Sequence, residues 1–155
     1  MTRLFFDTSF IIALEAADDH NHKTALDCWQ SIITSSPTLV TTSYVLDEVV
    51  TFFNSRNRHA KAVEIGNRLI NSPSIQFIHI DETLFNEAWG YFKKHEDKSY
   101  SLTDCISFII LERLPIQMSL TFDKHFVQAG FNKLPWRVGW IKAIAFHRRI
   151  HLYHT

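Results

Sequence analysis

Short apolar runs alternate with longer segments of helical periodicity along most of this chain, and that alternation constrains its fold more than any other feature. The predicted strands lie at residues 4–6, 39–42, 75–80 and 118–122, and the helical segments at residues 10–17, 22–35, 44–53, 60–70, 82–94 and 104–114. We expect Ser43 and Thr103 to cap the helices that follow them. Strands that are apolar on both faces are typical of a buried parallel sheet with helical crossovers. The pattern therefore predicts an α/β sandwich, in which helices cover both faces of a parallel sheet of four or five strands.

The size and composition of the chain fit one soluble domain. It has 155 residues, of which 46% are hydrophobic and 21% charged, as is usual for a protein that folds around one core. No apolar run reaches the roughly eighteen residues of a membrane span, and the first residues lack the cleavage site of a signal peptide. Cys28 and Cys105 fit neither a disulfide framework nor a thiolate metal site. We therefore expect a cytoplasmic protein with reduced cysteines and no membrane partner.

Charge is distributed unevenly, although the whole chain has a formal net charge of zero. Residues 136–155 contain four basic residues, three histidines and two tryptophans, but no acid, so the rest of the chain holds 12 basic and 16 acidic residues. An acidic body argues against a protein that coats duplex nucleic acid. If the protein acts on nucleic acid, metal ions would have to supply part of the attraction between the acidic body and the phosphates. The composition predicts a domain at residues 1–135 and a basic, aromatic C-terminal extension at residues 136–155.

Four acids stand at the ends of the predicted elements. Asp7 follows the first strand, Asp123 follows the fourth, Asp104 lies in the first turn of a helix, and Glu48 lies one turn into the helix after the second strand. In a parallel sheet, the carboxyl ends of the strands and the amino ends of the helices share one edge. Crowded carboxylates repel each other, and Mg²⁺ or Mn²⁺ removes that repulsion. Two such ions about 3.5–4 Å apart can activate water against a phosphodiester, so the four acids are compatible with a nuclease.

Each acid taken singly also has an ordinary explanation. Asp7 and Asp104 could be helix caps, because Asp is common at such positions. Glu48 could be a solvated helix residue, and Asp123 a turn residue. Position alone therefore leaves both interpretations open.

Four segments of the chain decide between these interpretations by resemblance. They read FFDTSFIIALEAADDHNHKTAL (residues 5–26), LVTTSYVLDEVVT (39–51), SLTDCISFIILERL (101–114) and SLTFDKHFVQAGFNKLP (119–135). In this order and with these intervals they resemble the four motif blocks of PIN-domain proteins, and in particular the VapC-type toxins of toxin–antitoxin pairs. The resemblance covers residues 3–135, and the chain departs from the family pattern in its tail after Pro135.

The resemblance implies a fold, an activity and a set of site residues. The fold would be the PIN-like three-layer α/β/α sandwich, and the activity Mg²⁺-dependent cleavage of structured RNA, often tRNA or rRNA, held in check by a cognate antitoxin. The four metal-binding acids would be Asp7, Glu48, Asp104 and Asp123. The hydroxyls of Thr8 and Thr103, beside them in the sequence, would support the site. A homodimer is also expected, but the sequence does not show whether the aromatic helices around Phe10, Trp29 and Phe52 form a dimer face or an antitoxin groove.

Other classes of function find less support in the residues. A metal-free ribonuclease would need two opposed imidazoles, and nothing fixes such a pair among His20, His22 and His125. The chain has no Gly-rich phosphate loop, since it contains only four glycines. Two rivals share the PIN-like fold and stay open: an RNA-processing nuclease without an antitoxin, and a scaffold that binds RNA or protein without catalysis.

Overall fold

A five-stranded parallel sheet forms the centre of the protein. The computed structural model describes residues 2–136. The strands are β1 (Arg3–Phe6), β2 (Thr38–Thr42), β3 (Ile75–Ile78), β4 (Met118–Leu120) and β5 (Lys133–Leu134). They lie in the order β3-β2-β1-β4-β5, and every neighbouring pair is parallel. The predicted parallel α/β fold is therefore confirmed, with five strands where four or five were expected.

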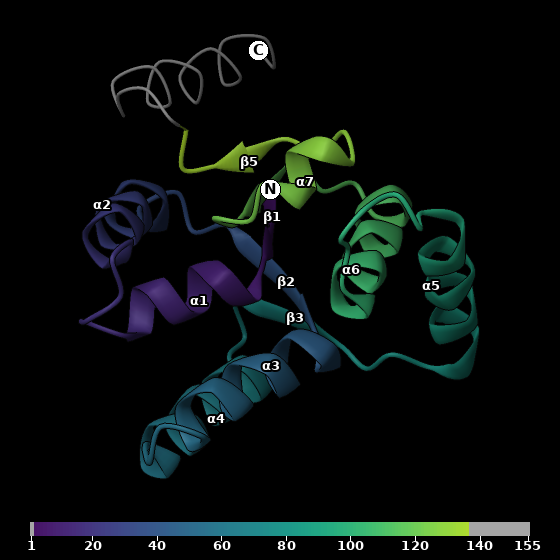
Figure 1. The fold of residues 1–155 in the computed structure, drawn as a ribbon. Coiled ribbons are helices and arrows are strands. Elements are labelled where there is room, and N and C mark those ends of the chain that lie inside the picture. Colours follow the sequence, from purple (N-terminus) through teal and green to yellow (C-terminus); the bar gives the residue numbers. More distant parts are fainter. Residues whose placement is uncertain (1, 137–155) are drawn as a thin grey trace, which may run out of the picture.

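Seven helices connect and cover the strands of the described region. They are α1 (Thr8–Glu15), α2 (His22–Ile33), α3 (Ser43–Asn54), α4 (His59–Asn71), α5 (Glu82–Lys94), α6 (Leu102–Arg113) and α7 (His125–Gln128). Figure 1 shows α1 and α2 on one side of the sheet and α5 and α6 on the other. The three layers of the predicted sandwich are thus present. No helix among residues 2–136 is long and apolar enough to cross a bilayer.

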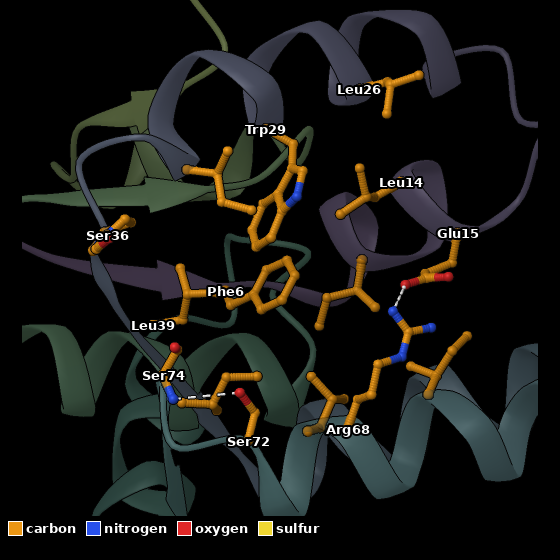
Figure 2. A pocket seen from close by; sticks show the side chains of 16 residues that line it. Phe6, Leu14, Glu15, Leu26, Trp29, Ser36, Leu39, Arg68, Ser72 and Ser74 are labelled. Atoms are coloured by element: carbon orange, nitrogen blue, oxygen red, sulfur yellow. Dashed lines mark hydrogen bonds and ion pairs between the residues drawn. The ribbon is translucent and has the colours of Figure 1, made fainter.

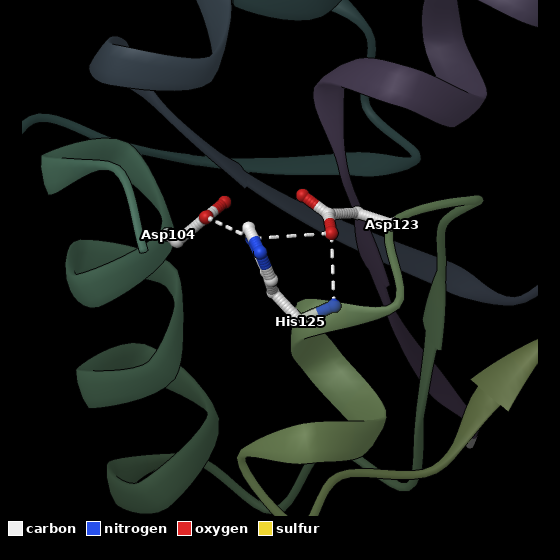
Figure 3. Close-up of side chains that lie close together, drawn as sticks. All are labelled: Asp104, Asp123 and His125. Atoms are coloured by element: carbon white, nitrogen blue, oxygen red, sulfur yellow. Dashed lines mark hydrogen bonds and ion pairs between the residues drawn. The ribbon is translucent and has the colours of Figure 1, made fainter. Parts of the chain in front are cut away.

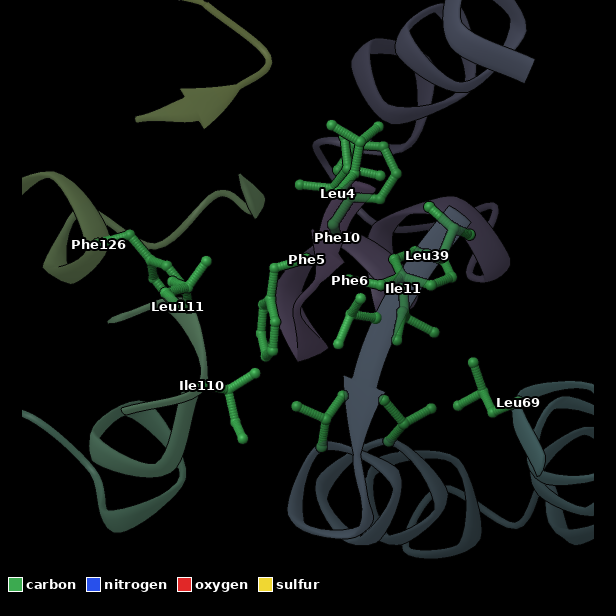
Figure 4. Close-up of a cluster of buried hydrophobic side chains, with 14 of the residues drawn as sticks. Leu4, Phe5, Phe6, Phe10, Ile11, Leu39, Leu69, Ile110, Leu111 and Phe126 are labelled. Carbon is green, nitrogen blue, oxygen red and sulfur yellow. The ribbon is translucent and has the colours of Figure 1, made fainter. Parts of the chain in front are cut away.

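Successive residues of β1 point into the two halves of the core. Phe6 packs toward α2, where its ring stacks on Trp29 with centroids 5.8 Å apart. Phe5 points the opposite way and contacts Phe126 of α7 at 6.2 Å. Figure 4 shows the two groups on either side of the sheet, with Leu69 of α4 on the side of Phe6. Both faces of β1 are therefore buried, which holds the residue after it, Asp7, in a fixed place.

Helix α6 is buried on almost every side, since all residues from 103 to 111 are buried. Its Phe108 lies at the middle of an aromatic group, with ring centroids 5.1 Å from Tyr100 and from Phe126 and 5.4 Å from Phe131. A helix that is apolar all round belongs inside a protein. The packing of α6 fixes Asp104 at its amino end.

The predicted helix caps are wrong by one residue in α3 and by two in α6. The N-cap of α3 is Thr42, whose hydroxyl accepts a hydrogen bond from the Val45 amide at 3.2 Å. The N-cap of α6 is Ser101, and not Thr103, because Ser101 and Asp104 form a reciprocal capping box: each side chain accepts a hydrogen bond from the other residue's amide at 3.0 Å. Thr103 already lies within the first turn, where its side chain cannot cap the helix.

The predicted C-terminal extension, apart from Trp136, lies outside the described residues.

Candidate metal centre

Asp7 joins the end of β1 to the start of α1. It is the N-cap of α1, and its own amide donates to the Leu120 carbonyl of β4 at 3.1 Å. Its carboxylate oxygen Oδ2 accepts hydrogen bonds from the hydroxyls of Ser9 at 2.8 Å and Thr121 at 2.7 Å. Those hydroxyls are held in turn by backbone amides, because Ser9 accepts from Phe122 and Thr121 accepts from Asp123, both at 2.9 Å. The orientation of the Asp7 carboxylate is therefore fixed from two segments that lie far apart in the sequence.

The burial of Asp7 makes its negative charge costly. The residue is only 4% exposed. Desolvation by burial raises the pKa of its carboxyl from 3.8 to about 6, and the charges of Asp104 and Asp123 add to the rise, while the hydroxyls of Thr121 and Ser9 oppose it. A cation beside Asp7 would offset this penalty.

Asp104, Asp123 and His125 form a compact group, as Figure 3 shows. Each offers a ligand atom, and these three atoms lie within 4.8 Å of one another. The Nδ1 atom of His125 lies 3.1 Å from Oδ2 of Asp104 and 3.3 Å from Oδ1 of Asp123. Burial raises the pKa of Asp104 and Asp123 raises it further, whereas the Ser101 amide and His125 lower it. The sequence had suggested His125 only as one imidazole of a metal-free ribonuclease, and not as a neighbour of these acids.

Glu48 approaches the group from α3 and lies at its rim, since the residue is exposed. Its Oε1 accepts a hydrogen bond from the Thr8 hydroxyl at 3.0 Å. Partial desolvation of its carboxylate raises its pKa, as does the charge of Asp104, while hydrogen bonds from Thr8 and Thr103 lower it. Both predicted supporting hydroxyls therefore act on Glu48, which lies outside the compact group of Asp104, Asp123 and His125.

The structure brings the four predicted acids to one edge of the sheet, and it also assigns ordinary roles to two of them. Asp7 caps α1, and Asp104 completes the capping box of α6. Two residues that the sequence interpretation missed, Ser9 and Thr121, hold Asp7. Ser9 stands in the DTS motif and Thr121 in the TFD motif, but nothing in the sequence shows that they meet.

The ligands available suit a hard divalent cation. Buried carboxylates with raised pKa values are the groups that gain most from a positive ion, and oxygen atoms are what Mg²⁺ and Mn²⁺ prefer. The residues of the site therefore fit the ion that the motif resemblance implies.

Comparison with known proteins identifies the family. The sequence pattern of the PIN domain matches residues 4–132, and the chain belongs to the PIN-domain family. It is 34% identical over 128 residues to the 23S rRNA-specific endonuclease VapC20 of Mycobacterium tuberculosis, a match that covers 83% of this chain and 95% of that protein. The crystal structure of VapC20, described as a sarcin–ricin loop cleaving toxin, superposes with a TM-score of 0.73 at 32% identity over the same shares of the two chains.

A second solved structure shares the fold alone. FitAcB from Neisseria gonorrhoeae has a TM-score of 0.61 at 17% identity, and the match covers 87% of this chain and 99% of that one. The family and fold predicted from the sequence are thus confirmed. The roles of the individual acids and the domain boundary at residue 135 remain predictions.

Proposed function

We propose that this chain is a metal-dependent endoribonuclease that hydrolyses a phosphodiester of structured RNA and serves as the toxin of a toxin–antitoxin pair. One observation carries the proposal: buried acids with raised pKa values meet at the sheet edge of a chain that matches VapC20 over 95% of that protein's length. The same acids argue against a non-catalytic scaffold, because Asp7 and Asp104 are buried and the burial of a charged carboxylate is costly unless a cation offsets it.

In the proposed mechanism, Asp7, Asp104 and Asp123 would hold a Mg²⁺ or Mn²⁺ ion, with Glu48 as the fourth acid at the rim. Such an ion would supply activation of the attacking water and neutralisation of charge at the phosphate. The hydroxyls of Ser9 and Thr121 both bind Oδ2 of Asp7, which leaves Oδ1 for the ion. Glu48 lies at the rim of the site, where a hydrogen bond from the Thr8 hydroxyl orients its carboxylate.

The substrate that we propose is a loop of ribosomal RNA. The argument rests on VapC20, which is named as a 23S rRNA-specific endonuclease and a sarcin–ricin loop cleaving toxin. Loops expose bases and backbone that a protein can read by shape, whereas the deep groove of an RNA helix is inaccessible to side chains. We place the activity in the cytoplasm, where ribosomes are found and where free cysteines such as Cys28 and Cys105 stay reduced.

Mapping of cleavage sites tests this proposal. Purified protein is incubated with total RNA, and new 5′ ends are located by primer extension. We expect discrete ends in ribosomal RNA with Mg²⁺ or Mn²⁺, no ends in excess EDTA, and none for Asp7→Asn. Asp47→Asn, which makes the same change at an exposed acid beside Glu48, serves as the control and should still cleave. Cleavage that persists in EDTA would contradict the metal mechanism.

An apolar cavity on the α1 side of the sheet offers a place for the antitoxin. The cavity has a volume of about 490 Å³ and lies between α1, α2 and α4. Figure 2 shows Phe6, Leu14 and Trp29 around it, with the ion pair between Glu15 and Arg68 at its edge, 2.7 Å long. We propose that an amphipathic helix of the antitoxin docks here through its apolar face. A processing nuclease without an antitoxin would leave this cavity without a partner.

The outer face of α5 supports the homodimer that the family resemblance implies. Phe85, Trp89 and Phe92 are spaced four and three residues apart, so they lie on one face of the helix. They are 36%, 44% and 38% exposed, and the rings of Trp89 and Phe92 stack at 5.5 Å. Exposed aromatic stripes of this kind are typical of protein interfaces. We propose that a second copy of the chain covers this stripe.

A further inference from the structure

The imidazole of His125 lies between two of the proposed metal ligands. Its Nδ1 atom is 3.1 Å from Oδ2 of Asp104 and 3.3 Å from Oδ1 of Asp123. In an octahedral site with bonds of about 2.1 Å, neighbouring ligand atoms lie roughly 3.0 Å apart. These two distances are close to the edges of such an octahedron. Two of the three edges of one octahedral face therefore already have the spacing of ligands, and the ligand atoms of all three residues lie within 4.8 Å of one another.

The position of His125 is fixed by its surroundings. Its backbone amide donates to Oδ1 of Asp123 at 2.8 Å, at the start of α7. Its ring meets the buried ring of Tyr100 edge-on, with centroids 5.3 Å apart and an angle of 74° between the planes. The side chain is only 17% exposed. A histidine held in this way needs little movement of its ring to bind an ion through Nδ1, once Nε2 carries the proton and Nδ1 no longer donates to Asp104.

Other histidines near the site do not have this arrangement. Nδ1 of His95, which belongs to the same aromatic group, lies 2.7 Å from the carbonyl of Tyr91. Among residues 2–136, the group with metal-ligand spacing contains one histidine, His125, together with the carboxylates of Asp104 and Asp123.

We propose that Nδ1 of His125 is a direct ligand of the divalent ion, together with Asp104 and Asp123, and that this nitrogen makes the site prefer Mn²⁺ to Mg²⁺. The inference rests on the proposed metal-dependent function and adds a nitrogen to the four acids. Mg²⁺ is a hard ion that keeps oxygen ligands and gives up water reluctantly. Transition-metal ions accept imidazole more readily, so a mixed nitrogen–oxygen site favours Mn²⁺ over Mg²⁺.

Pulsed electron paramagnetic resonance of Mn²⁺ bound to the full-length protein tests this proposal directly. A nitrogen bound to Mn²⁺ produces ¹⁴N modulation of the electron spin echo, and carboxylates and water do not. We expect ¹⁴N modulation in the wild type, and its replacement by a ¹⁵N pattern when only the histidines are labelled with ¹⁵N. This labelling experiment needs no substitution and so does not depend on how a variant folds.

Variants at His125 supply a second measurement. His125→Ala should weaken Mn²⁺ binding in titration calorimetry about tenfold or more, while Mg²⁺ affinity should change much less. His125→Asn places an amide oxygen near the same position and should abolish the preference for Mn²⁺. His20→Ala, which removes an exposed histidine from the turn between α1 and α2, is the matched control and should bind both ions as the wild type does.

Two results would overturn the inference in different ways. Bound Mn²⁺ without ¹⁴N modulation would show that the ion is held by oxygen atoms alone, and the proposed nuclease function would stand. A folded wild type that binds no Mn²⁺ at all would contradict both the ligand role of His125 and the proposed metal-dependent function.

Discussion

Replacement of Asp7 by asparagine should stabilise the metal-free protein at pH 8. Asp7 is 4% exposed, and its surroundings raise the pKa of its carboxyl from 3.8 to about 6, chiefly through desolvation. A rise of about two units corresponds to roughly 3 kcal/mol of unfavourable free energy for the ionised form. Asparagine keeps the shape and an oxygen that can accept from Ser9 and Thr121, but it carries no charge. The gain should approach but not reach 3 kcal/mol, since the new amide group also needs an acceptor.

The pH dependence of this gain follows from the direction of the shift. Between pH 3.8 and about 6 the folded protein binds a proton at Asp7 more tightly than the unfolded chain does. Stability contributed by this group therefore falls as pH rises through that window, and the penalty is complete above pH 6. Since Asp7→Asn lacks this penalty, the difference between variant and wild type should be largest at pH 8 and should disappear near pH 4.

Urea denaturation in EDTA, from pH 4 to pH 8, measures this difference. The matched control is Asp47→Asn at an exposed position, which should alter stability by no more than about 0.5 kcal/mol. An Asp7→Asn variant that is less stable than wild type by the same amount at every pH would refute the reasoning. Such a result would mean that the charged carboxylate of Asp7, as the N-cap of α1, stabilises the protein by more free energy than its burial costs.

Three further predictions concern the ion and the partners. Because protons compete with metal for Asp7, calorimetry should find Mg²⁺ affinity roughly tenfold lower at pH 5 than at pH 8, whereas an affinity independent of pH would place the ion away from Asp7. Leu26→Glu at the rim of the cavity should prevent co-purification with the antitoxin but leave RNA cleavage unchanged, and retained co-purification would exclude this docking site. Trp89→Glu should convert a dimer into a monomer in light scattering, and a dimer that persists would show that α5 is not the interface.

Much of the fold could be predicted because the local pattern and the tertiary structure agree. Because both faces of β1 are buried, its residues form an apolar run that predicts a strand. Helix α5 lies at residues 82–94, as the helical periodicity indicated. The two-residue strand β5 was too short to show a pattern of its own. The caps were misplaced because several hydroxyl residues precede α6, and only the pairing of Ser101 with Asp104 identifies the true one.

The candidate site could be predicted only in part. The resemblance to PIN-domain motifs indicated the four acids, but the network that holds Asp7 joins residues more than a hundred positions apart, and no local signal reveals it. The place of His125 between Asp104 and Asp123 depends on how α7 packs against α6. Such contacts are set by the packing of the core, as between Phe108 and Phe126, and not by the residues beside the motif.

The most direct test of the central claim is the position of the ion itself. A crystal of the protein soaked with Mn²⁺ and measured at the manganese absorption edge locates the ion by its anomalous scattering. The proposed site predicts a peak within bonding distance, about 2.2 Å, of carboxylate oxygens from Asp7, Asp104 and Asp123. A peak at another place on the protein, or none at saturating Mn²⁺, would contradict the claim that these acids form a metal centre.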